Sequence, residues 1–143
     1  MRSILFALLA LIVATVPLAA APTRLDPHTA TYELRTYYPA PGKLAALNAR
    51  FREHTLALFA RHGMTNVAYW NEPPSPTQPD GRVIYVLAYP SRAARDRSWQ
   101  AFGADPAWRA VAAASEADGR LVVRIDSVFM TMTDYSPLLA LGR

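Results

Sequence analysis

The chain contains no cysteine, and this absence excludes several classes of chemistry together. Disulfide bonds, thiolate zinc sites, cysteine nucleophiles and a lipid-modified N-terminal cysteine all need that residue. Histidine is scarce as well. His54 and His62 are two turns apart on an expected helix, about 12 Å, and His28 falls in an expected leader. One ion cannot bind side chains so far apart, so we expect no metal site.

Motifs that hold nucleotides, calcium or an acyl group are also missing. The sequence has no P-loop, dinucleotide fingerprint or calcium loop, and no serine lies in a Gly-x-Ser-x-Gly context. We therefore expect no cofactor and no serine hydrolase. The net charge of +4 comes from arginines that are scattered singly, which predicts no nucleic-acid partner. The excess of arginine over lysine is typical of a GC-rich genome, although it would also suit anion binding.

The first residues have the pattern of a secretory signal. Arg2 supplies a positive charge, residues 4–16 are apolar apart from one threonine, Pro17 interrupts the segment, and residues 18–21 are mostly small. We interpret residues 1–21 as a signal peptide. The segment is shorter than the roughly 20 apolar residues of a membrane-spanning helix.

The cleavage site and the compartment follow from the same segment. Pro22 would follow a cut at Ala21 directly, and signal peptidases generally do not tolerate proline at that position, so we expect the cut after Ala20. An uncleaved inner-membrane anchor is the alternative, and it would be the protein's one link to a membrane. In both cases the rest of the chain is expected to be periplasmic or secreted, with residues 22–30 as a flexible leader.

Residues 31–137 of the mature chain read as one domain with alternating strand and helix patterns. Strands are expected at 31–38, 66–72, 83–89 and 121–131, and helices at 43–62, 91–103 and 105–118. The order β-α-β-β-α-β predicts an α+β, ferredoxin-like fold, with a four-stranded antiparallel sheet and helices on one face.

The last expected strand is apolar on both faces. One face carries Leu121, Val123, Ile125 and Phe129, and the other carries Val122, Val128 and Met130. Helices can cover only one of them. A second copy stacked on the other would hide it from water, so we expect a two-fold homodimer.

Short motifs along the domain support a family resemblance. They include Tyr32-Glu33-Leu34-Arg35-Thr36-Tyr37, Arg50-Phe51-Arg52-Glu53-His54-Thr55, the run Trp99…Phe102…Asp105-Pro106…Trp108, and Thr133-Asp134-Tyr135-Ser136-Pro137. In combination they resemble the NIPSNAP family, within the wider group of dimeric α/β-barrel proteins. The secretory signal departs from the familiar eukaryotic members, which are mitochondrial, and the proline-rich 73–79 loop is a further variation.

The resemblance implies more about fold than about chemistry. NIPSNAP proteins as a class have no agreed enzymatic activity. Related barrel families include cofactor-independent monooxygenases, which place substrates in a pocket between sheet and helices. Fold-level analogy of this kind does not establish a reaction.

His54 is the candidate catalytic residue. It lies about 70° from the centre of the apolar stripe of its expected helix, which would let it face a pocket between helix and sheet and act as a base. Arg35 or Tyr69 would then polarise a carbonyl or phenol. The alternative is a boundary histidine that hydrogen-bonds a carbonyl or Thr55.

Two pairs of charged residues on strands need partners. Glu33 and Arg35 share one face with Tyr37, which we expect to point outward, and Arg124 and Asp126 share one face of the last strand. One interpretation is an ion-pair network that sets the register of the dimer. The other is an arginine that binds an acidic ligand.

Aromatic residues are numerous for a chain of this length. Most would serve as ordinary core, but tyrosine hydroxyls in an apolar cavity would suit a flat hydrophobic ligand. The candidate ligand-pocket residues are Tyr32, Arg35, Tyr37, Tyr69, Trp70, Tyr85 and Arg124.

Three functional hypotheses follow. The first is an exported NIPSNAP-like homodimer that binds a small apolar or aromatic ligand. The second is a cofactor-independent monooxygenase-like or isomerase-like enzyme that uses His54. The third is a protein-interaction module whose exposed face docks to a partner.

Overall fold

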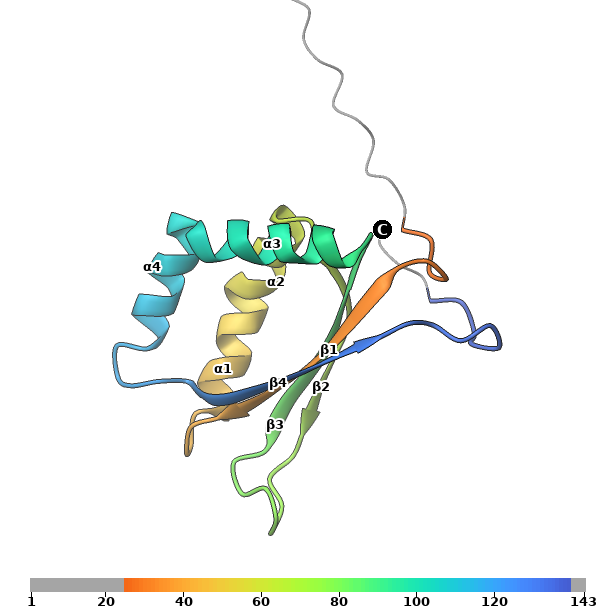
Figure 1. Cartoon of the computed structure of the whole chain (residues 1–143). Coiled ribbons are helices and arrows are strands. Elements are labelled where there is room, and N and C mark those ends of the chain that lie inside the picture. Colours follow the sequence, from red (N-terminus) through yellow and green to blue (C-terminus); the bar gives the residue numbers. More distant parts are fainter. Residues whose placement is uncertain (1–24, 140–143) are drawn as a thin grey trace, which may run out of the picture.

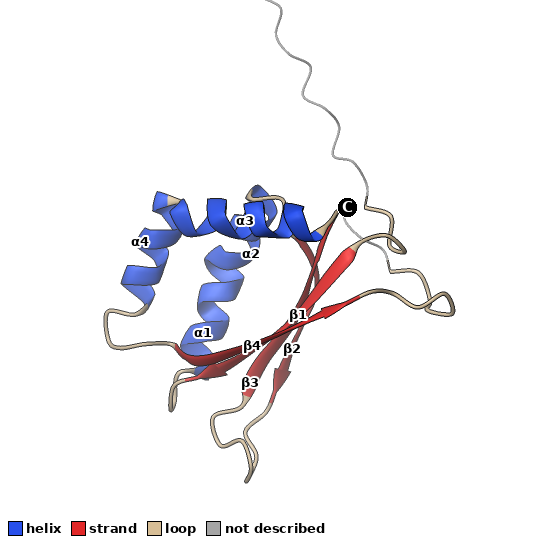
Figure 2. Cartoon of the chain, in the orientation of Figure 1, coloured by secondary structure: helices blue, strands red, loops and turns tan. Residues whose placement is uncertain are grey.

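A twisted four-stranded sheet with helices on one face forms the body of the protein (Figures 1 and 2). The computed structural model describes residues 25–139, so the expected signal peptide and the first three residues of the expected leader, 22–24, lie outside the described residues. The strands are β1 (Thr31–Pro39), β2 (Thr65–Glu72), β3 (Arg82–Tyr89) and β4 (Val122–Met130). Their order is β2-β3-β1-β4 and every pairing is antiparallel. The predicted α+β, ferredoxin-like fold with a four-stranded antiparallel sheet is confirmed.

The first helical segment contains an unexpected π-helical turn. It consists of α1 (Leu44–Arg50), the π-helix η1 (Phe51–Thr55) and α2 (Leu56–Arg61). The Thr55 hydroxyl donates to the Arg50 carbonyl, five residues earlier, at 3.1 Å. This turn brings Phe51 and Thr55 together on the buried side of the helix. Such turns are rare and occur often at functional sites.

The second helical region forms a corner, as the sequence predicts. Helix α3 (Arg92–Ala104) begins at Ser91, whose hydroxyl accepts the Ala94 N–H, and α4 (Pro106–Ser115) begins at Asp105, whose carboxylate accepts the Ala107 N–H. The expected end of α4 at residue 118 is three residues too late. None of the helices within residues 25–139 is long and apolar enough to cross a membrane.

The main core lies between the sheet and the helices and is largely aromatic. Phe51 and Tyr85 rings meet edge to face at 5.2 Å, and the same geometry joins Phe59 to Trp99 at 5.4 Å. The fully enclosed residues there include Tyr85, Tyr89, Phe59, Leu47, Met64 and Leu87.

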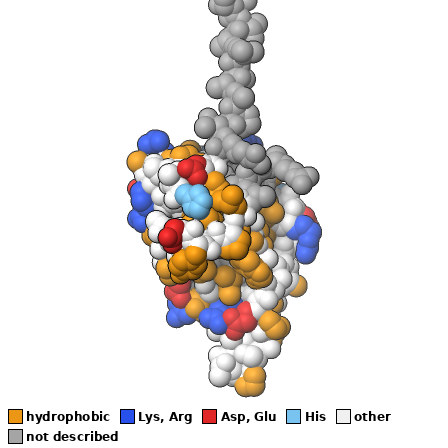
Figure 3. Space-filling view, turned by 90° about the vertical axis from the view of Figure 1, so that its right-hand side faces the viewer, with side chains coloured by type: hydrophobic (Ala, Val, Ile, Leu, Met, Phe, Trp, Pro, Cys, Tyr) orange, Lys and Arg blue, Asp and Glu red, His pale blue; other side chains and the backbone are white. Residues whose placement is uncertain are grey.

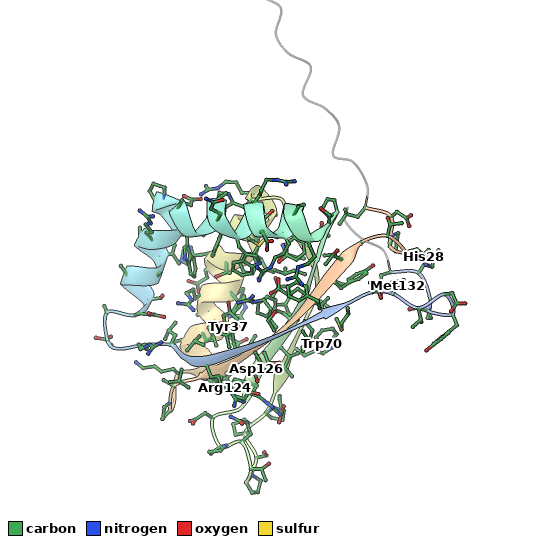
Figure 4. All side chains as sticks on the ribbon, viewed as in Figure 1. His28, Tyr37, Trp70, Arg124, Asp126 and Met132 are labelled. Atoms are coloured by element: carbon green, nitrogen blue, oxygen red, sulfur yellow. The ribbon has the colours of Figure 1, made fainter. Side chains whose placement is uncertain are left out.

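The structure corrects the predicted orientation of β1. Glu33, Arg35 and Tyr37 face the helices and are buried, whereas they were expected to point outward. Arg124 and Asp126 of β4 pair with Tyr38 and Thr36, so they lie on the opposite face of the sheet. Figure 4 shows Tyr37 and these two residues on either side of the sheet. A two-residue period separates the faces of a strand but does not say which face the helices cover.

Strand β4 remains exposed on both faces. Val123 and Ile125, on the helix side, are 55% and 45% exposed, and Val128, on the other side, is 54% exposed. Hydrophobic side chains gather across the middle of the helix-free side (Figure 3). A small cluster of Ala30, Tyr32, Val86 and Ala88 covers only part of that face, with help from Met130 and Met132.

Candidate functional site

A fully buried carboxylate, Glu33, organises the space between the sheet and α3. Its neighbours are all hydrogen-bond donors from three strands and one helix. They are Arg35 Nη1 at 2.6 Å, Arg95 Nη2 and Nε at 2.7 and 2.9 Å, Ser127 Oγ at 2.7 Å, the Tyr89 hydroxyl at 3.1 Å and Trp99 Nε1 at 3.3 Å. Charge-assisted bonds of this number hold the carboxylate ionised and in one orientation.

The donors outweigh the cost of burying Glu33. Burial alone would raise its pKa, but hydrogen bonds from Arg95 and Ser127 and the charge and hydrogen bond of Arg35 lower the pKa of Glu33 to about 2. The same contacts act on Tyr89. Burial first, and then the negative charge of Glu33, raise the pKa of the Tyr89 hydroxyl above its usual range. At neutral pH the cluster is one carboxylate, two guanidiniums and neutral phenols.

Arg35 binds Glu33 on one side and lines an open cleft on the other. Its Nε donates to the Tyr85 hydroxyl at 3.1 Å, and its Cζ lies 4.3 Å from the centre of the Trp99 ring. The side chain is 11% exposed, and that exposure is toward the cleft, which it lines. The cluster therefore fixes the guanidinium plane rigidly at the floor of the cleft.

The cleft has a volume of about 550 Å³ and lies between the β1–β4 side of the sheet and the helices. Its walls are mainly aromatic and aliphatic side chains. They include Tyr37, Phe51, Phe59, Trp99, Phe102, Trp108, Ala112, Val122, Val123 and Ile125. Thr55 of the π-helical turn also lines it. A concave, mostly apolar site of this size with a few placed polar groups is typical of a small-molecule site.

The charged residues that line the cleft are four arginines and one acid, Glu116. Arg50 Nη1 donates to Glu116 at 3.0 Å and to Ser115 at 3.3 Å, so it is paired. Arg120 lies exposed at the rim. Arg124 borders the cleft, but its guanidinium stacks on Tyr38, with Cζ 3.6 Å from the ring centre, on the helix-free face.

The structure divides the candidate ligand-pocket residues among several places. Arg35, Tyr37 and Arg124 line the cleft, whereas Tyr69 and Trp70 line a separate pocket of about 230 Å³ beside β2. Tyr85 is completely buried, with its hydroxyl on Arg35. Tyr32 lies on the helix-free face and donates to the Pro27 carbonyl at 3.0 Å.

His54 is placed away from the cleft. It lies on the outer side of η1, in a shallow groove between α1 and α4 lined by residues such as Ala49, Val111 and Ala114. Its side chain is 48% exposed, and Nε2 is 3.9 Å from Glu53. The expected orientation into a pocket between helix and sheet is wrong. The extra residue of the π-helical turn changes the helical phase at this point, which a count of 100° per residue does not allow for.

Sequence reasoning missed several residues of the site. Arg95 and Ser127 bind Glu33, and the Trp108 ring centre lies 5.3 Å from Arg50 Cζ. No pattern within the sequence connects these residues. Trp99 and Trp108 did stand out in the family motif. The signal that could have indicated this site is Glu33 itself, an acid in a strand with many apolar residues. Such an acid needs cations from other elements when it is buried.

Comparisons with known proteins agree with this fold. The family model described as NIPSNAP matches residues 32–137. The chain is similar to the structure of a NIPSNAP-like domain protein from Burkholderia xenovorans, with 20% identity and a TM-score of 0.66 over 81% of this chain and 97% of that one. A NIPSNAP family protein from Agrobacterium tumefaciens has 22% identity and a TM-score of 0.64, over 81% and 99%. A second protein from that organism has 23% and 0.63, over 76% and 98%. No curated protein matches the chain.

The Glu33 cluster predicts a specific dependence of stability on pH. The folded-state pKa of about 2 lies below the ordinary value of 4.5, so the carboxylate contributes stability above pH 4.5, and that contribution is lost as the pH falls toward 2. We expect Glu33→Gln to lower the free energy of unfolding by about 3 kcal/mol at pH 7, because two guanidiniums lose their counter-ion.

Urea unfolding at a series of pH values measures this effect. The difference between the wild type and Glu33→Gln should shrink below pH 4.5, while the control Glu53→Gln, at a carboxylate that is 62% exposed, should follow the wild type. A difference that stays constant down to pH 2 would contradict the assignment.

Proposed function

Because the chain belongs to the NIPSNAP family, whose model covers most of it, we propose that it is an exported homodimer that binds a small apolar or aromatic ligand. The observation that carries this proposal is the cleft of about 550 Å³ with aromatic walls. Pockets of 300 to 1,000 Å³ with such linings are typical of small-ligand sites. The residues that line the cleft include no histidine, and their one acid, Glu116, is held by Arg50. We therefore propose binding rather than proton transfer.

Dimerisation is supported by the helix-free face of the sheet. Val128, Leu34 and Ile84 lie there with Trp70, which is 53% exposed, and no element within residues 25–139 covers the middle of that face. A second copy that stacks its own sheet on this surface would bury it symmetrically. The charged pair Arg124 and Asp126 at 3.3 Å would then set the register.

Export is supported by the pattern of residues 1–21, which lie outside the described residues. Cell fractionation combined with intact-mass measurement tests it. We expect a periplasmic or secreted protein that has lost about 20 residues. A full-length protein in the cytoplasm would contradict export, and a full-length protein in the membrane fraction would indicate the anchor.

Ligand binding can be tested by filling the cleft. Ala112 of α4 lines the cleft and its neighbour Ala113 is exposed outside it. The neutral aromatic dye N-phenyl-1-naphthylamine should bind the wild-type protein with enhanced fluorescence, and Ala112→Phe should weaken binding roughly tenfold or more because the ring occupies the cleft.

The matched control is Ala113→Phe, which adds the same ring at the next position and should bind like the wild type. If the two variants bind the dye equally well, the cleft is not the binding site. If the wild type does not bind the dye at all, the proposed ligand class is wrong.

Two substitutions in the same strand, β4, test the proposed dimer interface. Val128 lies on the helix-free face of β4 and Ile125 on the cleft side, and both are about half exposed. We expect wild-type protein to sediment as a dimer at micromolar concentration. Val128→Asp should weaken the dimer roughly 100-fold because it buries an unpaired charge, and Ile125→Asp should leave it intact. A monomeric wild type, or equal effects of the two variants, would reject this interface.

A further inference from the structure

One nitrogen of the Arg35 guanidinium, Nη2, is not used by the fold. Nη1 donates to Glu33 and Nε donates to the Tyr85 hydroxyl, whereas Nη2 makes no hydrogen bond to any residue that the structure describes. Among the described residues, every side-chain nitrogen or oxygen that is shut off from solvent has a hydrogen-bond partner. Because Nη2 has no such partner, it must be open to solvent. The open space that Arg35 borders is the cleft. A free donor therefore lies at the cleft floor.

Arg35 is also not needed to neutralise Glu33. Arg95 already donates to both carboxylate oxygens, at 2.7 and 2.9 Å, so one acid is flanked by two cations. Arg95 also binds Asp96 at 3.2 Å, but that carboxylate is 63% exposed to water, so the buried part of the cluster keeps a surplus of one positive charge. Arg35 is the member of the cluster that borders the cleft. A surplus charge with little access to water is costly, and a ligand anion would compensate it.

The other charges of the cleft do not cancel this surplus. Glu116, the single acid in the lining, is paired with Arg50 at 3.0 Å. Arg120 adds a further cation at the rim. An incoming anion therefore meets a positive potential from the mouth to the floor of the cleft.

The shape of the donor favours a planar anion. The guanidinium lies over the Trp99 ring, with Cζ 4.3 Å from the ring centre, and its hydrogen bonds to Glu33 and Tyr85 fix the plane in which Nη2 lies. Planar guanidinium edges match the geometry of carboxylates, and a pre-organised donor loses little entropy on binding. The hydroxyl-bearing Tyr37 lines the cleft beside it.

We propose that the ligand of the cleft is a small carboxylic acid with a flat apolar body, whose carboxylate accepts a hydrogen bond from Nη2 of Arg35. The apolar body lies among the aromatic walls formed by residues such as Phe51, Trp99 and Trp108. This inference rests on the proposed function, because it requires that the cleft binds a ligand, and it adds the chemical class of that ligand.

Isothermal titration calorimetry with 1-naphthoate and 1-naphthamide tests the charge preference. The two compounds share one ring system and differ in charge at neutral pH. We expect 1-naphthoate to bind roughly 10- to 100-fold more tightly, the range of a charge-assisted hydrogen bond in a site with little water. Equal affinities would overturn the inference.

Three variants test whether the preference for 1-naphthoate over 1-naphthamide depends on Arg35. Arg35→Met should reduce the preference for 1-naphthoate to less than about threefold, and Arg35→Lys, which keeps a charge opposite Glu33 but has no planar edge, should weaken 1-naphthoate roughly tenfold and leave 1-naphthamide unchanged. The control Arg97→Met removes one positive charge from the exposed face of α3, outside the cleft lining, and should bind both compounds like the wild type.

The outcomes separate this inference from the proposed function. Binding of the neutral dye with no preference for 1-naphthoate leaves the ligand-binding function standing and rejects the carboxylate. A preference that stays at the wild-type level in Arg35→Met, or that Arg97→Met reduces as much as Arg35→Met does, shows general attraction by net charge and rejects the role of Arg35. No binding of the dye or of either naphthalene compound rejects both.

Discussion

The buried carboxylate of Glu33 is the constraint on which the rest of the structure depends. A carboxylate at the centre of a sheet is tolerated only if several donors surround it, and here they come from β1, β3, β4 and α3. Arg95 and Trp99 therefore have to lie over β1, which places α3 across the sheet. The burial of the Glu33 carboxylate therefore requires α3 to lie in this position.

The same requirement shapes the cleft. Because α3 is drawn toward Glu33 and then turns at Asp105 into α4, the helices cover β1 and β3 but leave the outer part of β4 uncovered. The uncovered space becomes a cleft with aromatic walls, and the Glu33 cluster contributes its surplus cation, Arg35, to the floor. The π-helical turn completes the wall by directing Phe51 and Thr55 inward.

Strand β4 links the two surfaces that the proposals concern. Its residues alternate between the cleft, where Ile125 lies, and the helix-free face, where Val128 lies. In a dimer whose sheets stack, the second copy would cover Val128 and leave the cleft of each protomer accessible. Ligand binding and dimerisation would then use opposite faces of one strand, so the Val128 and Ile125 variants separate them.

Local patterns in the sequence determined the element order, the capped corner at Asp105 and the ferredoxin-like fold, because strand alternation, helix caps and proline-rich turns act within a few residues. The family resemblance came from motifs of the same short range. Only the tertiary structure decided which face of β1 is buried, where His54 points, and which side chains meet Glu33. Those outcomes depend on the packing of segments up to 94 residues apart, as in the bond between Glu33 and Ser127. A contact between residues so far apart in the sequence produces no periodic pattern from which it could be predicted.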